Sequence, residues 1–295
     1  MNKHDTIAGA ADSTQVKAPA ARMQRARGAA RLSATHLDGR TRLARLYQQG
    51  SAKIRMPRSH HGSALDAVLI NTSGGLTGGD QMDWTIDLGR NAKAIITTQS
   101  CERIYRARSD AACINTDITL AEGAALSWLP QETILFDGGA YVRKLTVRLA
   151  PGASFLMVEP LIIGRTAMGE IVNSGSIHDH WRIYRGGHLL HAEDMRLDGD
   201  MQTLLKRAST AAGAIALATI IVVHDDCDDM VEPLRLRLGA NSGISCIHSS
   251  AGKRLVFRCI AESGFALRKE IVPVIDWCNS KIIGPGHGLP KLWNT

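Results

Sequence analysis

The sequence lacks most of the signatures that define familiar catalytic, secreted or membrane proteins. No apolar stretch reaches the roughly 18 residues that a membrane-spanning helix needs, and the nearest, residues 211–223, is shorter and typical of a core strand. No apolar segment with a cleavage site occurs at the N-terminus, so we expect no secretion. The six cysteines form no C-x-x-C pair, which favours reduced, packed thiols. No G-x-S-x-G elbow indicates a serine nucleophile.

The most distinctive segment that is present is the glycine-rich run NTSGGLTGGD, Asn71–Asp80. Its glycines suggest a phosphate cradle, because they let backbone N–H groups close on an anion. A P-loop, however, continues from its last glycine into Lys and then Ser or Thr, whereas Gly79 is followed by Asp80 and Gln81. No G-x-G-x-x-G occurs elsewhere. We therefore expect a buried strand that leads into closely packed backbone, with Asp80 carrying charge at its exit.

Positive charge is concentrated at the N-terminus. The formal net charge is +7, and residues 1–58 hold twelve Lys and Arg against three acids, whereas the remainder holds 23 against 25. We expect residues 1–28 to form a disordered basic arm and residues 29–295 to form a single domain. Such an arm can also contact an acidic partner or nucleic acid, but no aromatic residues for base stacking are interleaved with it.

A repeat of about thirty residues predicts the fold. The segments IDLGRNAKAIITTQ, ITLAEGAALSWLPQ and VRLAPGASFLMVEP share the order strand, polar turn, alanine and strand. Their matching alanines, Ala92, Ala124 and Ala153, lie 32 and 29 residues apart. Stacked β-coils produce such a period. Apolar and polar side chains alternate in RKLTVRL, residues 143–149, which indicates strands with one face exposed to solvent. We predict a mostly β, β-helix-like or solenoid-like stack of strands with a few helices.

Helix is expected mainly near the C-terminus. Residues 266–280 place apolar side chains on one helical stripe, although Pro273 should kink a helix there unless it lies near the start. A second helix is expected over residues 227–238, and a hairpin over residues 243–259 with its turn at 250–253. The expected buried stripe consists of Leu267, Ile271, Val274, Ile275 and Cys278.

Six further segments follow the glycine-rich run in order. They are TTQSCERIYR, WLPQETILFDGG, EPLIIGRTAMGE, DHWRIYRGG, AEDMRLDGD and LPKLW. Together these segments resemble the urease accessory protein UreD family, also called UreH. The resemblance extends from about Ala29 to the C-terminus.

This resemblance implies a non-enzymatic maturation factor in the cytoplasm, with a β-helix-like body. It implies action with UreF and the GTPase UreG, docking on apo-urease, and help with nickel insertion. GTP hydrolysis would belong to UreG, no cofactor would be tightly bound, and nickel would be in transit through an internal channel. Neither nucleic acid nor a membrane is an expected partner.

Carboxylates in the matching segments are the candidate nickel contacts, because they bind a borderline ion weakly enough to release it. An alternative for each is a structural pairing with an arginine such as Arg103, Arg106 or Arg165. The six candidates are Asp80, Glu102, Glu132, Asp137, Glu159 and Glu170, and Asp194 lies in a matching segment as well.

Histidines offer another interpretation. His178 and His180 fall on one face of an expected strand, and His188 with His191 would meet on a helix or flank a turn at residues 186–187. A His-x-His pair with a third ligand can hold nickel or zinc. Solvated or hydrogen-bonded histidines in an exposed hairpin explain the same residues.

Two other classes of function stay open. An enzyme for a small substrate on a β-solenoid would need convergent acid and base residues, and a basic nucleic-acid-binding protein would show a steep salt dependence. Cys101 beside Glu102 is the nearest reactive-looking pair, but a neighbouring carboxylate raises the pKa of a thiol. Trp293 in LPKLW needs a cover, and we expect the protein's own coil end to provide it, the alternative being UreF.

Overall fold

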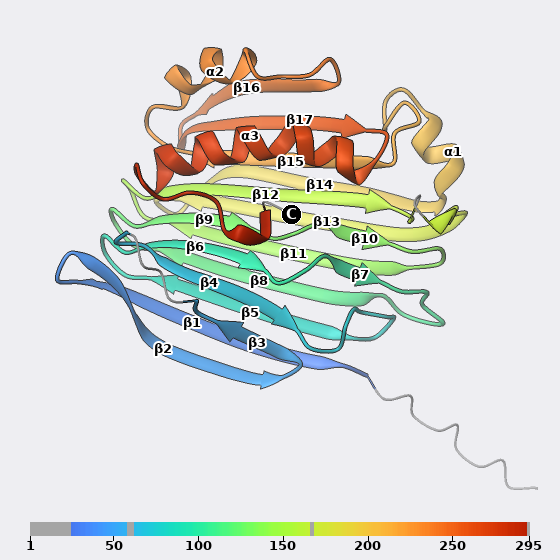
Figure 1. The fold of residues 1–295 in the computed structure, drawn as a ribbon, viewed down its shortest axis with the longest axis horizontal. Coiled ribbons are helices and arrows are strands. Elements are labelled where there is room, and N and C mark those ends of the chain that lie inside the picture. Colours follow the sequence, from blue (N-terminus) through green and yellow to red (C-terminus); the bar gives the residue numbers. More distant parts are fainter. Residues whose placement is uncertain (1–24, 58–61, 166–167, 294–295) are drawn as a thin grey trace, which may run out of the picture.

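The computed structural model describes residues 25–57, 62–165 and 168–293, and most of these residues form two sheets that enclose a core (Figure 1). Sheet A contains, in spatial order, β14 (His188–Asp200), β13 (Ser174–Arg185), β11 (Ala140–Leu149), β8 (Ala112–Leu120), β5 (Gln81–Leu88), β1 (Arg27–Leu37) and β2 (Arg40–Gly50). Sheet B contains β16 (Ser242–Ser249), β17 (Gly252–Ala261), β15 (Ala216–Val223), β12 (Ser154–Ile163), β9 (Ala125–Leu129), β6 (Lys93–Thr98), β4 (Leu65–Asn71) and β3 (Ala52–Arg55). Two short strands, β7 (Glu102–Ile104) and β10 (Thr133–Leu135), pair beside the end of β12.

The chain alternates between the two sheets, which confirms the predicted solenoid-like stack. Strands β5, β8, β11 and β13 pair in parallel in sheet A, while β4, β6, β9 and β12 do so in sheet B. The three repeated segments lie in register: in each turn the alanine N–H donates to the carbonyl three residues earlier, at 3.0 to 3.1 Å. These alanines, Ala92, Ala124 and Ala153, are buried. Their burial leaves no solvent-facing room for a larger side chain.

Antiparallel hairpins extend the stack. Strands β13 and β14 join through Gly186 and Gly187, whose positive φ angles of 55° and 83° suit a tight two-residue hairpin turn. The hairpin predicted over residues 243–259 is β16 with β17. The strand predicted over residues 211–223 begins later, at Ala216.

The outer face of sheet B is covered by α3 (Gly264–Ile282), with α2 (Cys227–Arg235) beside β16. All five residues of the predicted apolar stripe of α3 are buried there. Ser263 begins the helix by accepting a hydrogen bond from the Ala266 N–H at 3.1 Å. The helix continues through Pro273, because the burial of the stripe offsets the lost backbone hydrogen bond. A further short helix, α1 (Met201–Lys206), follows β14.

Both ends of the described chain are attached to the sheets, the first through β1 in sheet A and the last through Trp293 on sheet B. Residues 1–24 of the predicted basic arm lie outside the described residues, and β1 begins at Arg27. Trp293 in the short helix η2 (Lys291–Trp293) is only 2% exposed and donates its Nε1–H to the Leu129 carbonyl at 3.2 Å. The protein thus covers Trp293 itself, as predicted, but the cover lies beside β9 in the middle of sheet B, so the prediction that the coil end provides it was wrong. None of the described helices is long and apolar enough to cross a bilayer.

Candidate functional site

Five of the six candidate carboxylates lie along one edge of the stack, where the chain leaves sheet B for sheet A. Because the coils are parallel, successive connections lie above one another, and residues far apart in sequence share this edge. The sixth, Glu159, lies on β12 and faces the space between the sheets. The five edge residues are Asp80, Glu102, Glu132, Asp137 and Glu170.

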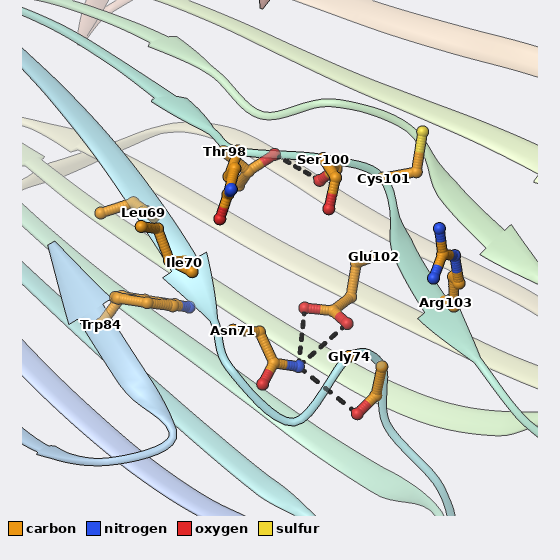
Figure 2. Close-up of a pocket in the computed structure, with 12 residues that line it drawn as sticks. Leu69, Ile70, Asn71, Gly74, Trp84, Thr98, Ser100, Cys101, Glu102 and Arg103 are labelled. Carbon is orange, nitrogen blue, oxygen red and sulfur yellow. Dashed lines mark hydrogen bonds between the residues drawn. The ribbon is translucent and has the colours of Figure 1, made fainter. Parts of the chain in front are cut away.

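A cavity of about 80 Å³ opens at this edge (Figure 2). Asn71 from the glycine-rich run and Glu102 from β7 line it together with Trp84. The Asn71 Nδ2 amide donates to both Glu102 carboxylate oxygens, at 3.1 and 3.2 Å. Burial raises the pKa of Glu102 to about 7. This carboxyl group is therefore able to change its charge near neutral pH inside a small polar cavity.

Asp80 holds the glycine-rich run in place. One of its carboxylate oxygens accepts the Thr77 N–H at 2.8 Å, and the other accepts the Ala26 N–H at 2.8 Å. The side chain is buried and does not line the cavity. Its carboxylate thus closes the loop on itself and fastens the start of β1.

Glu132 joins the edge of the stack to α3. Its buried carboxylate accepts hydrogen bonds from Arg268 Nε at 2.6 Å and from the Cys101 thiol at 3.2 Å. Burial, reinforced by the charge of Glu132, raises the pKa of Cys101 to about 12. The thiol is therefore protonated at neutral pH, which agrees with the sequence argument against a nucleophile here.

Asp137 and Glu170 lie in neighbouring connections of this edge, where the Asp137 N–H donates to Glu170 Oε1 at 3.4 Å. Asp137 accepts the backbone N–H groups of Asn173 and Ser174, and these bonds, that of Ser174 foremost, hold the pKa of Asp137 below its ordinary value. Asp137 also pairs with Arg106, and Glu170 pairs with Arg165 at 2.8 Å. The alternative of arginine pairing is thus observed for both residues.

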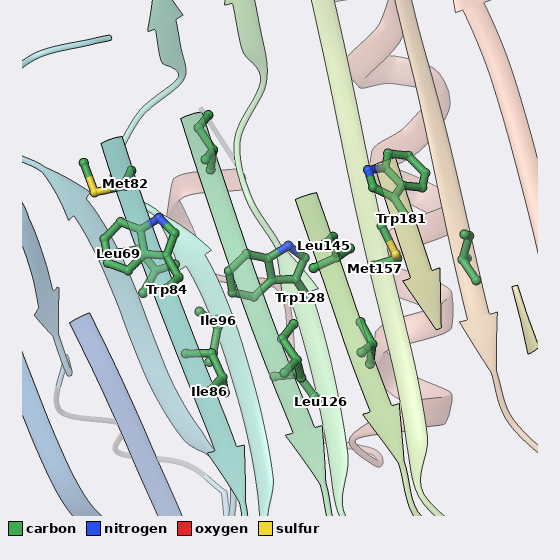
Figure 3. Packing of buried hydrophobic residues seen from close by; sticks show 14 of the residues in the cluster. Leu69, Met82, Trp84, Ile86, Ile96, Leu126, Trp128, Leu145, Met157 and Trp181 are labelled. Carbon is green, nitrogen blue, oxygen red and sulfur yellow. The ribbon is translucent and has the colours of Figure 1, made fainter. Parts of the chain in front are cut away.

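Glu159 belongs to a charged cluster between the sheets. Arg143 on β11 donates to Glu159 from one side and to Asp179 on β13 from the other, with Nε 2.9 Å from Asp179 Oδ1. Trp128 Nε1 donates to Glu159 at 3.2 Å, and Trp181 Nε1 donates to Asp179. Burial raises the pKa of Glu159 to about 7 despite the neighbouring guanidinium. Figure 3 shows Trp84, Trp128 and Trp181 projecting into this interior from β5, β9 and β13.

Arg143 and Asp179 are functional candidates that sequence reasoning missed, although a signal was present. In the strand Ala140–Leu149 the inward positions are Tyr141, Arg143 and then three apolar residues, so Arg143 interrupts the buried face of a clean two-residue period. Asp179 interrupts the inward face of β13 in the same way. Charges at positions that periodicity assigns to a core indicate a buried ion pair.

The four histidines separate into different environments. His178 and His180 lie on one face of β13, as predicted, beside Asp194 on β14. His188 starts β14 directly after the glycine turn. His191 is buried, accepts a hydrogen bond from Arg254 Nε at 3.2 Å, and has a pKa lowered to about 4 by burial.

The fold and these sites define a β-solenoid-like protein whose ionisable groups are held inside its stack and along one edge. The family model of the UreD urease accessory protein matches residues 26–294, and the chain belongs to this family. It is 46% identical to "Urease accessory protein UreD" of Chelativorans sp. over 280 aligned residues. The aligned region covers 95% of this chain and 98% of that protein. The Mesorhizobium japonicum protein of the same name is 45% identical over 271 residues, 92% of this chain and 95% of its own length. "Urease accessory protein UreD 1" of Brucella abortus is 44% identical with the same coverage.

Proposed function

We propose that this chain is a urease maturation factor that helps insert nickel into apo-urease, acting in the cytoplasm with UreF and UreG. The observation that carries the proposal is membership of a urease accessory family over residues 26–294. In this scheme GTP hydrolysis belongs to UreG, and nickel is a cargo that this chain passes on.

Two carboxyl groups with raised pKa values provide a physical basis for transit. Glu102 in the edge cavity and Glu159 between the sheets both have pKa values raised to about 7 by burial. A carboxyl group that exchanges a proton for a divalent ion near neutral pH is a weak and reversible oxygen ligand. Asp137 and Glu170 are engaged by arginines, as Glu159 is, but hydrogen bonds from the Ser174 N–H and from Arg165, respectively, lower their pKa values, so they serve as secondary contacts. Glu132 is likewise held by an arginine and is a secondary contact as well. Asp80 keeps the glycine-rich run closed.

The proposal is tested by co-expressing urease with its accessory proteins and isosteric variants of this chain. Glu102→Gln and Glu159→Gln remove a carboxylate without changing the shape of the side chain. Glu122→Gln is the matched control, because Glu122 is exposed and forms a surface ion pair with Arg90. We expect Glu102→Gln and Glu159→Gln each to lower the nickel content and activity of purified urease while UreF capture stays normal.

Two contrary outcomes are distinguishable. Normal nickel content with both glutamine variants would remove these residues from the route but leave the maturation role intact. Full urease activation in cells that lack this chain would overturn the maturation role itself.

A further inference from the structure

The outer face of sheet A carries a compact group of metal-ligating atoms. His178 and His180 on β13 project from this face, and Asp194 on β14 lies directly opposite His180 in the antiparallel register. His178 Nε2 is 3.1 Å from Asp194 Oδ1, and His180 Nδ1 is 3.0 Å from Asp194 Oδ2. The alternation of a strand fixes both imidazoles on the same side.

The spacing of these atoms suits a transition metal. One ligand atom from each of the three residues lies within 4.8 Å of the other two. Metal–ligand bonds of about 2.0–2.2 Å in a tetrahedral site place neighbouring ligand atoms about 3.3–3.6 Å apart. The two nitrogen–oxygen contacts, at 3.1 and 3.0 Å, therefore need to open by a few tenths of an ångström, and the two imidazole nitrogens, which now face different oxygens of Asp194, must turn toward one shared ion. The side chains are 27%, 33% and 42% exposed, so water can complete the coordination.

We propose that His178, His180 and Asp194 bind a divalent first-row transition ion of the imidazole-preferring class, such as Ni²⁺ or Zn²⁺. Two nitrogen ligands and one carboxylate oxygen favour these ions over Mg²⁺ or Ca²⁺, which prefer all-oxygen sites. The site lies on the outer face of the sheet, apart from the interior carboxylates. It therefore stands independently of the proposed route of nickel insertion.

Binding requires a change of protonation at both rings. The nitrogens that now hydrogen-bond to Asp194 must present lone pairs to the ion, so each neutral imidazole carries its proton on the other ring nitrogen, and an imidazolium releases one proton. The Asp194 carboxylate needs no such change, because a carboxylate is ionised at neutral pH and binds the ion through its oxygen lone pairs.

Cationic side chains around the group limit its affinity. Arg196 Nε is 3.3 Å from Asp194 Oδ1, Arg182 Nη2 is 4.0 Å from Oδ2, and Lys144 lies next to His180 on the neighbouring strand β11. Each competes for the carboxylate or repels the ion. The site therefore binds reversibly, and removal of the Arg196 charge should strengthen binding. If the His–Asp cluster had only a structural role, removal of the Arg196 charge would not strengthen binding of an ion.

A second group, Asp228, Cys246 and His248, offers an internal comparison. There the Lys253 ammonium is 2.5 Å from Asp228 Oδ2, and burial raises the pKa of the Cys246 thiol to about 12. A thiol that stays protonated and a carboxylate that already has a counter-charge make this group the weaker ligand set.

The experiment titrates the purified full-length chain, without a polyhistidine tag, with NiCl₂ and CoCl₂. Isothermal calorimetry gives the stoichiometry and affinity, and the visible spectrum of bound Co²⁺ reports coordination by nitrogen and oxygen. Variants His178→Gln, His180→Gln and Asp194→Asn are compared with two controls, His188→Gln on the same hairpin and His248→Gln in the second group. Circular dichroism and thermal melting establish that each variant is folded.

We expect the three site variants to weaken binding at this site at least about tenfold, the two controls to bind as the wild type, and Arg196→Gln to bind more tightly. Absence of binding to the wild type would overturn the proposal, as would unchanged stoichiometry and affinity in the three folded site variants. Loss of binding confined to His248→Gln would assign the ion to the second group instead.

Discussion

Arg143 on β11 and Glu159 on β12 form an ion pair that crosses the interior from sheet A to sheet B. Asp179, which is completely buried, shares the same guanidinium. One guanidinium thus binds two carboxyl groups, and its single positive charge balances one of them, in a region otherwise packed with apolar side chains and tryptophan. Both sheets must be correctly placed for this arrangement to form, so the cluster couples the two halves of each coil.

Replacing Arg143 with Met should destabilise the fold by about 3–5 kcal/mol, because it leaves a buried carboxylate without a counter-charge. Urea denaturation followed by circular dichroism measures the loss. Arg148→Met is the control, since the exposed Arg148–Asp117 pair at 3.2 Å contributes at most about 1 kcal/mol. Adding Asp179→Asn to Arg143→Met should recover part of the loss. Additive losses would contradict the idea that the charges are coupled.

The stability contribution of Glu102 should depend on pH. Its pKa is raised from 4.5 to about 7 in the folded state, so its contribution is fully present below about 4.5 and is lost as pH rises through about 7. The difference in unfolding free energy between wild type and Glu102→Gln should therefore fall across this interval. His191, whose pKa is lowered to about 4, changes stability with pH in the opposite sense. Because His191 is present in both the wild type and the Glu102→Gln variant, its contribution cancels in the difference. A constant difference between pH 4.5 and 8 would contradict the assignment.

Trp293→Ala should destabilise the protein by about 3–5 kcal/mol, as loss of a large buried aromatic does. The ring is 2% exposed, bonds to the Leu129 carbonyl, and lies 5.1 Å from the Arg268 guanidinium. Phe265→Ala is the control, because Phe265 is 69% exposed at the start of α3. Differential scanning calorimetry compares the two. Unchanged stability combined with lost UreF capture would instead assign Trp293 to a partner contact.

Deletion of residues 2–24 should leave the melting temperature nearly unchanged, because this segment is basic and has no apolar period. Deletion of residues 2–30 removes the start of β1 and the Ala26 N–H that bonds to Asp80, so a clear drop is expected. A drop of several degrees, about 1 kcal/mol or more, for the shorter deletion would show that the arm packs on the domain.

The repeat-based prediction of the fold was accurate because local and global signals agree. The turn alanines Ala92, Ala124 and Ala153 are buried in equivalent turns, and they recur in the sequence at a period of about thirty residues. The stripe on α3 was predictable for the same reason. Pro273 was misleading, since tertiary packing outweighs the local preference of one residue.

The candidate site was less predictable, because acidic residues in matching segments do not reveal which partner each one has. Asp80 bonds to backbone amides, whereas Glu102 lines a cavity, yet both are acids near the same glycine-rich run. The distinction depends on where Ala26 and Asn71 lie in space. Sequence alone gave the residue types along the edge but not their burial, and burial determines which of them change charge near neutral pH.

The position of α3 over sheet B has a consequence for the protein during synthesis. Every coil precedes this helix in the chain, so the apolar outer face of β9, β12 and β15 is made long before its cover. A nascent chain with finished coils but no α3 would present that bare surface to other molecules. Released chains that end shortly before residue 264 should therefore aggregate in a sedimentation assay, whereas released chains that extend through residue 293 should stay in solution.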